Sequence, residues 1–378
     1  MKGKPCRQIL FAQFVSMEQL ISQKYNRSFI EKEGDNMSKV YFIKNSESDY
    51  NQLGKDALEL LRKIVSDTGH RFEKEVPIKV HFGEKGNKTF IPAKCYEETI
   101  NYLKEEGVSP SYIETNVLYR GSRTTTELHI ETAKSHGFTQ IPIIIADGDI
   151  GTEYDEIEIN KEYIKKCKIG KGYGEFNQFI VMSHFKGHIA AGFGGALKQL
   201  AMGFAARGGK LEQHSGISPV VDAEKCISCG ICEKKCNFGA IQTPDTAVID
   251  ESKCIGCAGC IAVCPKGAIE NTWGGSHFLE KLSEYAYGAA KDKDIIYITF
   301  VHNITKECDC AGTHMKPITG NIGILAGKDP VALDIACLDL VQKNSGKKLF
   351  EKGRPSLIHA EKIGLGTMEY ELIEINNM

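Results

Sequence analysis

Residues 178–188, "QFIVMSHFKGH", run from an apolar segment directly into a polar turn. Helical patterns separate such segments, for example "GKDALELLRKIVSDT" (54–68), in which Leu58, Leu61 and Val65 form an apolar stripe. The same strand-like pattern returns in "KVYFIKN" (39–45), "IPIIIADGD" (141–149), "DIIYITFVHN" (294–303) and "NIGILAGKDP" (321–330). Because strands alternate with helices, the sequence predicts an α/β fold with a mostly parallel sheet and helices on both faces.

Polar side chains follow the predicted strands where each strand ends. Ligands of open α/β sheets bind outside the carboxyl ends of the strands, so these groups are expected to line one cleft. They are Arg120 and Arg123 after 112–119, Asp147 and Asp149 after 141–145, Ser183, His184, Lys186 and His188 after 178–182, His302 and Asn303 after 294–301, and Asp329 after 322–326. We predict catalytic roles for His184, Lys186, His188 and Arg120, with Lys186 and Arg120 holding an anionic substrate.

Several of these groups also have simpler explanations. The two arginines could be surface charges, and Asp147-Gly148-Asp149 has the composition of an ordinary turn. Asp329-Pro330 is typical of a helix N-cap followed by proline. The segment "GFGGALK" (192–198) could bind phosphate at a helix N-terminus, but close helix packing explains its glycines equally well. We expect Cys95, Cys167 and Cys337 to be buried structural thiols.

Two similar segments carry eight of the 14 cysteines: "DAEKCISCGICEKKCNFGAIQT" (222–243) and "DESKCIGCAGCIAVCPKGAIEN" (250–271). Each contains C-x2-C-x2-C-x3-C, in which the fourth cysteine binds the other cluster in two-cluster ferredoxins. One predicted ligand set is Cys226, Cys229, Cys232 and Cys264, and the other is Cys254, Cys257, Cys260 and Cys236. Zinc is the alternative metal, although the repeated spacing suits cubane clusters better. The unit resembles the bacterial two-[4Fe-4S] ferredoxin domain over roughly 218–272, except that Asn237 replaces the proline expected after Cys236.

The stretch "ECDCAG" (307–312) holds Cys308 and Cys310, which lie outside both repeats. Each predicted cluster already has four thiolates, so this pair is not needed as cluster ligands. A disulfide is not expected, because the C-x-C spacing is short and cytosolic thiols are kept reduced. We predict that these two thiols, together with His184 and His188, bind an additional metal or form a third redox centre in the cleft. Two plain loop thiols are the alternative.

Composition limits the class of protein. A net charge of −2 argues against nucleic-acid binding, and no apolar run approaches the length of a membrane span. The predicted domains are 37–217 and 273–378 for the two parts of the α/β frame and 218–272 for the inserted iron–sulfur domain. We expect residues 1–36 to be a misassigned or disordered leader. The codons for "KEGDN" before Met37 could contain a ribosome-binding sequence, so that translation would start at Met37.

Several segments together resemble the family named "domain of unknown function 362", across most of 37–378. They are "TNVLYRGSRTTTELHIETAKSHGF", "IIADGDIG", "MSHFKGHIAAGFGGALKQLAMG", "NITKECDCAG" and "IGILAGKDPVALDIACLDL". The resemblance implies that His184, Lys186, His188, Lys198, Cys308, Cys310 and Asp334 fall at family motif positions, and it supplies no reaction. The fold is more distantly similar to that of the nickel-pincer lactate racemases, which implies no substrate.

Three functions follow from these patterns. The first is an iron–sulfur oxidoreductase that moves electrons through two [4Fe-4S] clusters to or from the cleft. The second is a non-enzymatic, ferredoxin-like carrier whose α/β frame docks a redox partner. The third is a non-redox isomerase or lyase with structural clusters. We expect a cytoplasmic location, a ferredoxin, flavodoxin or reductase as redox partner, an anionic small-molecule substrate, and no nucleic-acid or membrane partner.

Overall fold

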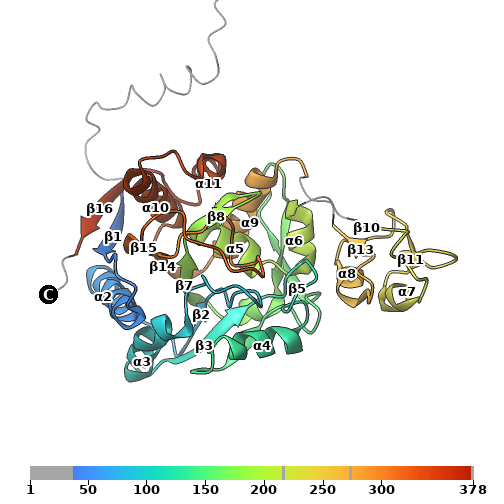
Figure 1. Ribbon diagram of the computed structural model, residues 1–378, viewed down its shortest axis with the longest axis horizontal. Helices are drawn as coiled ribbons and strands as arrows, with labels where there is room; N and C mark the ends of the chain where they lie inside the picture. Colours follow the sequence, from blue (N-terminus) through green and yellow to red (C-terminus); the bar gives the residue numbers. More distant parts are fainter. Residues whose placement is uncertain (1–36, 215–217, 272–274, 376–378) are drawn as a thin grey trace, which may run out of the picture. The chain divides into compact units, whose positions relative to one another are not determined.

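An eight-stranded sheet forms the centre of the fold in the computed structural model, which describes residues 37–214, 218–271 and 275–375 (Figure 1). The strand order is β16-β1-β15-β14-β7-β2-β3-β4. In chain order the strands are β1 (Ser38–Lys44), β2 (Glu75–Lys79), β3 (Ser109–Glu114), β4 (Ile143–Ile145), β7 (Gln178–His184), β14 (Asp294–Val301), β15 (Gly323–Gly327) and β16 (Tyr370–Glu374). The α/β fold predicted from the sequence is confirmed.

Strand directions decide which loops meet at one edge. Strands β14, β7, β2, β3 and β4 are parallel neighbours, and β1 is parallel to β16. Strand β15 is antiparallel to both of its neighbours, β1 and β14. The residues after β15 therefore lie at the edge where the parallel strands begin, opposite the carboxyl edge.

Asp329 follows β15, so the prediction that it lines the cleft is wrong. Its carboxylate instead accepts hydrogen bonds from the N–H groups of Val331 (2.8 Å) and Ala332 (3.0 Å). It is the N-cap of α10 (Pro330–Ser345), with Pro330 in the first turn and Gly346 in the left-handed conformation at the other end. The N-cap alternative is confirmed.

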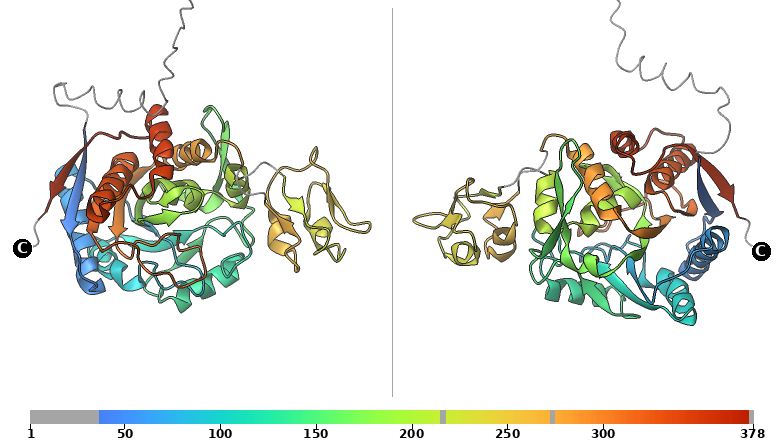
Figure 2. Two further views of the ribbon diagram at one scale, coloured as in Figure 1. Left: turned by 45° about the horizontal axis from the view of Figure 1, so that its top comes forward. Right: turned by 180° about the vertical axis from the view of Figure 1, so that it is seen from behind.

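Helices cover both faces of the sheet because successive strand residues point to opposite sides. Val40 and Phe42 of β1 pack in one apolar cluster, and Tyr41 and Ile43 pack in the other. The first cluster includes residues of α5 (Ala196–Phe204), α9 (Phe278–Ala290), α10 and α11 (Arg354–Lys362). The second includes residues of α2 (Tyr50–Thr68), α3 (Glu97–Glu105) and α4 (Thr126–Ser135) (Figure 2).

Two short hairpins and further helical turns surround this frame. Strand β5 (Tyr154–Glu158) pairs with β6 (Lys166–Gly170), and β8 (Lys186–His188) pairs with β9 (Gly192–Gly194). Helix α6 (Arg207–His214) follows α5, and 3-10 turns occupy Ala93–Tyr96, Lys171–Glu175 and Glu351–Gly353. The hairpin β8–β9 carries the predicted site residues Lys186 and His188 beyond the end of β7.

Residues 218–271 form two similar halves. Helix α7 (Ile231–Lys235) belongs to the first half and α8 (Gly259–Val263) to the second. Strand β10 (Val220–Val221) pairs with β13 (Ile269–Glu270), and β11 (Ile241–Gln242) pairs with β12 (Val248–Ile249). This segment and the α/β frame belong to one compact unit that begins at Ser38, and Lys168 Nζ donates to the carbonyl of Ile255 at 2.9 Å.

The predicted leader, residues 1–36, lies outside the described residues. Across the described part of the chain, no helix is both long and apolar enough to cross a membrane. Cys95, Cys167 and Cys337 are fully buried, as predicted. Burial raises the pKa of Cys95 to about 12, which keeps this thiol protonated at neutral pH.

Candidate functional site

Asp309 organises the carboxyl edge of the sheet. It stands between the two cysteines of the C-x-C pair, in the connection 302–322 between β14 and β15, and it is fully buried. One of its carboxylate oxygens lies 2.9 Å from His184 Nδ1 and 3.0 Å from Lys186 Nζ. The Asp309 carboxylate therefore ties this connection to the end of β7 and the start of β8.

His184 has a polar neighbour at each of its two ring nitrogens. Its Nδ1 faces the Asp309 carboxylate, and its Nε2 lies 2.6 Å from the carbonyl oxygen of His302. The carboxylate and the carbonyl oxygen therefore fix the orientation of this buried imidazole. Burial alone would raise the pKa of Asp309, but His184 and Lys186 hold this pKa well below its usual range.

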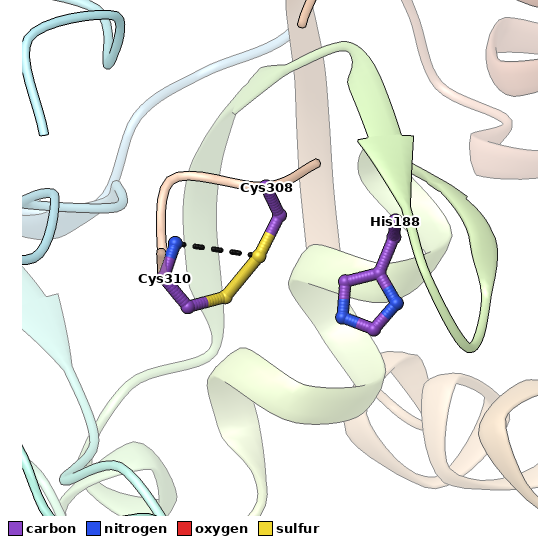
Figure 3. A group of neighbouring side chains, drawn as sticks. All are labelled: His188, Cys308 and Cys310. Atoms are coloured by element: carbon purple, nitrogen blue, oxygen red, sulfur yellow. Dashed lines mark hydrogen bonds between the residues drawn. A yellow bond between two sulfur atoms is a disulfide. The ribbon is translucent and has the colours of Figure 1, made fainter. Parts of the chain in front are cut away.

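Cys308 and Cys310 form a disulfide, contrary to the prediction from their spacing (Figure 3). The buried Asp309 side chain turns inward between them, and the two Cα atoms lie 5.3 Å apart, within the usual range for disulfides. Cys310 N donates to Cys308 Sγ at 3.3 Å, and Tyr119 Oη donates to the Cys310 carbonyl at 3.2 Å. The pair is thus held as a defined turn on the wall of the cleft.

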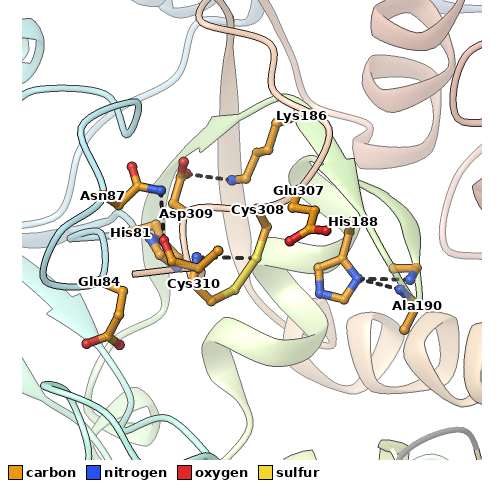
Figure 4. Close-up of a disulfide and its surroundings, with 12 residues drawn as sticks. His81, Glu84, Asn87, Lys186, His188, Ala190, Glu307, Cys308, Asp309 and Cys310 are labelled. Carbon is orange, nitrogen blue, oxygen red and sulfur yellow. Dashed lines mark hydrogen bonds and ion pairs between the residues drawn. A yellow bond between two sulfur atoms is a disulfide. The ribbon is translucent and has the colours of Figure 1, made fainter. Parts of the chain in front are cut away.

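His188 stands beside the disulfide (Figure 3). Its ring offers one nitrogen within 4.8 Å of both sulfur atoms, a grouping that could hold a metal ion. However, Nδ1 accepts hydrogen bonds from the N–H groups of Ala190 (3.2 Å) and Ala191 (2.9 Å), and the two sulfurs are bonded to each other. The proton of the neutral ring must therefore sit on Nε2, the nitrogen on the side facing the disulfide (Figure 4). Burial and nearby lysines hold the pKa of His188 well below 6.5, so the ring is neutral and carries its proton on Nε2.

A cavity of about 300 Å³ opens in front of this group. Its lining is mainly apolar, with a small number of polar groups, as is usual for small-molecule sites. The residues that matter for its chemistry are His81, Tyr119, Arg123, His188, Lys198, Lys210, Cys308 and Cys310. The carboxylates of the lining are Glu114, which pairs with the buried Lys79 at 2.9 Å, and the exposed Glu307.

The three cations of this lining differ in their partners. Arg123 Nε lies 3.3 Å from the Glu84 carboxylate, and its guanidinium also donates to Tyr119 Oη at 2.8 Å. Lys210 Nζ donates to Thr115 Oγ1 at 2.7 Å and to a backbone carbonyl. No hydrogen bond or ion pair joins Lys198 to another residue of the described ranges. Burial, reinforced by Lys186, lowers the pKa of Lys198 to about 7.

The structure brings only part of the predicted catalytic set into the cavity. His188 lines it, whereas His184 and Lys186 lie behind the C-x-C turn and hold Asp309. Arg120 is exposed and does not belong to the lining, where Arg123 stands instead. Sequence reasoning missed His81, which lines the cavity, and Asp309, which lies buried behind the lining, because both positions depend on tertiary contacts.

Two other predicted features have structural explanations. Asp147 is fully buried and accepts hydrogen bonds from the backbone N–H (2.9 Å) and side chain (3.1 Å) of Asn116. The N-terminus of α5 is already occupied, because the Asp334 carboxylate accepts from the N–H groups of Ala196 (2.7 Å) and Leu197 (2.8 Å). This cap leaves no room for the phosphate considered for "GFGGALK".

The eight repeat cysteines separate into two groups around two cavities. Cys226, Cys229, Cys232 and Cys264 line one cavity, and Cys236, Cys254, Cys257 and Cys260 line the other. Backbone N–H groups point at three of the sulfurs: Ala247 N at Cys226 (3.3 Å), Ala240 N at Cys236 (3.3 Å) and Ala268 N at Cys264 (3.2 Å). Such bonds favour the thiolate form that a metal cluster requires.

A comparison with known protein families finds one match that covers the cavity and the cysteine repeats. A family model described as domain of unknown function (DUF362) covers residues 76–339, which include the repeat cysteines, the C-x-C turn and the cavity lining. The chain belongs to the DUF362 family. A search of curated proteins finds no match to this DUF362 chain.

Two solved structures resemble this DUF362 protein in fold. The lactate racemase apoprotein from Thermoanaerobacterium thermosaccharolyticum has a TM-score of 0.42 and 13% identity, with 83% of this chain and 60% of that chain covered. A Thermotoga maritima protein has a TM-score of 0.42 and 10% identity, with 79% of this chain and 60% of that chain covered. The DUF362 chain therefore spans less than two thirds of the length of either structure.

Proposed function

We propose that this DUF362 protein is an iron–sulfur oxidoreductase in which two [4Fe-4S] clusters carry electrons between a redox partner and the Cys308–Cys310 pair. The observation that carries the proposal is the disulfide on the wall of a substrate-sized cavity. A disulfide and a dithiol differ by two electrons, so this pair can connect electron transfer to chemistry in the cleft. A simple electron carrier has no need of such a cavity.

The repeat cysteines support the iron–sulfur part of the proposal. Their division into two sets of four, with the fourth cysteine of each repeat in the other set, is the ligand pattern of two-cluster ferredoxins. The N–H groups that point at Cys226, Cys236 and Cys264 suit thiolate ligands. When bound, the clusters would supply one-electron transfer at low potential.

The chemistry at the pair itself is a balanced two-electron step. The bond between Cys308 Sγ and Cys310 Sγ breaks, and two electrons and two protons convert the disulfide into two thiols. The electrons come from a one-electron donor protein such as a ferredoxin or flavodoxin, and the protons come from solvent. After reduction, the Cys310 N–H can stabilise a thiolate on Cys308, and His188 Nε2–H can donate to a sulfur in the cavity.

Alkylation after reduction tests this proposal. The anaerobically purified protein, with its clusters loaded, is incubated with reduced ferredoxin, quenched with iodoacetamide and digested with trypsin. Peptide 307–328 contains only Cys308 and Cys310 among the cysteines, so its mass reports their state directly. We expect two added groups after reduction and none before it.

The control is the Cys229→Ser variant, which removes one exposed ligand of the first cysteine set. We expect slower labelling of peptide 307–328 in this variant. The proposal fails if ferredoxin leaves the loaded protein unlabelled, or if the variant is labelled as fast as the parent protein.

A further inference from the structure

Resting on the proposed function, we infer that the cleft binds a small anionic disulfide, whose charged group lies against Lys198 and whose sulfur meets Cys310. The inference adds a substrate class to the redox pair. It is drawn from three features of the cavity: its available cation, its apolar walls, and the unequal exposure of its two sulfurs.

Lys198 is the available cation. The other two cations of the lining are committed to protein partners, Arg123 to Glu84 and Tyr119, and Lys210 to Thr115. Lys198 has no such partner within the described residues. A cationic amine in a partly enclosed, mainly apolar site gains stability from an anion, since desolvation otherwise disfavours its charge.

The shape and walls of the cavity suit a small organic molecule. The volume is about 300 Å³, and apolar side chains such as Val117, Leu118 and Met202 contribute to the lining. An apolar cavity with a few oriented polar groups binds the body of a ligand by burial and its polar group by specific contacts. Lys198, His188 and the sulfur pair are present in the same lining.

The two sulfurs have unequal access. Cys308 is 6% exposed, whereas Cys310 is only partly buried. In the reduced pair, Cys310 is therefore the sulfur that a substrate reaches first. Cys308 receives the hydrogen bond from Cys310 N, which stabilises a thiolate poised for the second attack.

The reaction balances without a further reagent once the pair is reduced. The Cys310 thiolate attacks one sulfur of the substrate disulfide; a Cys310–substrate bond forms and the first thiolate leaves. Cys308 thiolate then attacks Cys310 Sγ, restores the Cys308–Cys310 bond and releases the second thiolate. Two electrons pass from the pair to the substrate, and the two protons of the dithiol pass to the products or solvent. His188 Nε2–H is available to stabilise a departing thiolate.

The test compares two disulfides that differ in charge. Protein reduced with a phosphine and desalted anaerobically is mixed in a stopped-flow instrument with 5,5′-dithiobis(2-nitrobenzoate), an anion, or with 4,4′-dithiodipyridine, which is neutral. Cys310→Ser protein supplies the background from other thiols. The quantity measured is the ratio of the two Cys310-dependent rate constants.

We expect Lys198→Met to lower this anionic-to-neutral ratio about tenfold. The control Lys348→Met should leave the ratio unchanged, because it removes an exposed lysine from an adjoining hollow that shares His188 with the cleft. An unchanged ratio in Lys198→Met overturns the inference, and the proposed function stands if the neutral disulfide still reacts through Cys310. If neither disulfide reacts through Cys310, the inference is overturned. The proposed function is overturned with it only if reduced ferredoxin also leaves peptide 307–328 unlabelled.

Discussion

Replacement of Asp309 by asparagine tests the arrangement that holds the C-x-C turn. The substitution keeps the size and shape of the side chain and removes its negative charge. In the folded chain that charge lies between His184 Nδ1 (2.9 Å) and Lys186 Nζ (3.0 Å), with all three side chains buried. The variant would leave the buried Lys186 ammonium without its counter-charge and His184 without its carboxylate partner.

The expected cost follows from this burial. Removal of one partner of a buried ion pair destabilises proteins by about 3–5 kcal/mol, because the remaining charge stays desolvated. We therefore expect Asp309→Asn to lower the free energy of unfolding by about 3–5 kcal/mol. The exposed Asp292 provides a matched control, and Asp292→Asn should change this free energy by less than about 0.5 kcal/mol.

Urea unfolding followed by circular dichroism, under anaerobic conditions and with equal iron content in each variant, measures the effect. The pH dependence adds a second measurement. Since the pKa of Asp309 in the folded chain lies well below its ordinary value of 3.8, its stabilising contribution is complete above that pH and declines as the pH falls below it. The difference between parent and Asp309→Asn protein should therefore be constant near neutral pH and smaller at about pH 3.

A loss of less than about 1 kcal/mol at neutral pH would refute the reasoning, because surface ion pairs contribute that much or less. The double variant Asp309→Asn/Lys186→Met separates charge from shape. It removes the uncompensated ammonium of Lys186, so it should be more stable than Asp309→Asn alone.

Three further predictions concern the hairpin, the cleft and the cysteine sets. Gly187→Ala would place a Cβ against the Lys306 carbonyl oxygen. We expect this clash to lower the free energy of unfolding in urea by about 1–3 kcal/mol and to speed alkylation of peptide 307–328. Unchanged values would contradict this prediction. The affinity for 2-nitrobenzoate, measured by calorimetry, should fall about tenfold per pH unit above about pH 7, because Lys198 loses its proton there. The charged groups that face Lys198 are Lys186, Asp309, Glu114 and Arg123. Constant affinity from pH 6 to 9 would contradict the assignment of Lys198 as the anion-binding group. Cys264→Ser should disturb one [4Fe-4S] signal and leave the other intact in electron paramagnetic resonance, and the disturbed cluster should be the one also changed by Cys226→Ser.

The alternation of apolar segments and helical stripes was sufficient to predict the α/β class and most of its strands. The direction of each strand in the sheet was not predictable, because an apolar strand has the same sequence pattern whether it is parallel or antiparallel to its neighbours. Because β15 is antiparallel to both neighbours, Asp329 lies at the edge of the sheet opposite the cleft. Strand length was also overestimated at 112–119, where β3 ends at Glu114 and a loop carries Tyr119, Arg120 and Arg123.

The site was predictable where residues near one another in sequence also meet in space. His188 belongs to the segment "SHFKGH", and the structure places it beside the cysteine pair. The disulfide was missed because spacing alone does not show that Asp309 is held inward by its contacts with His184 and Lys186. The choice between Arg120 and Arg123 depended on which one Glu84 binds, and Glu84 lies in a distant part of the chain.

The antiparallel direction of β15 has a consequence for which side chains this cleft could carry. Neighbouring antiparallel strands can be joined by a turn of two residues, so β14 and β15 do not require the long connection 302–322. The sheet would keep its topology if that connection were exchanged for another. The Cys308–Cys310 disulfide thus lies in a segment that the sheet topology does not require, and chains that share this scaffold are free to carry different side chains at the same position.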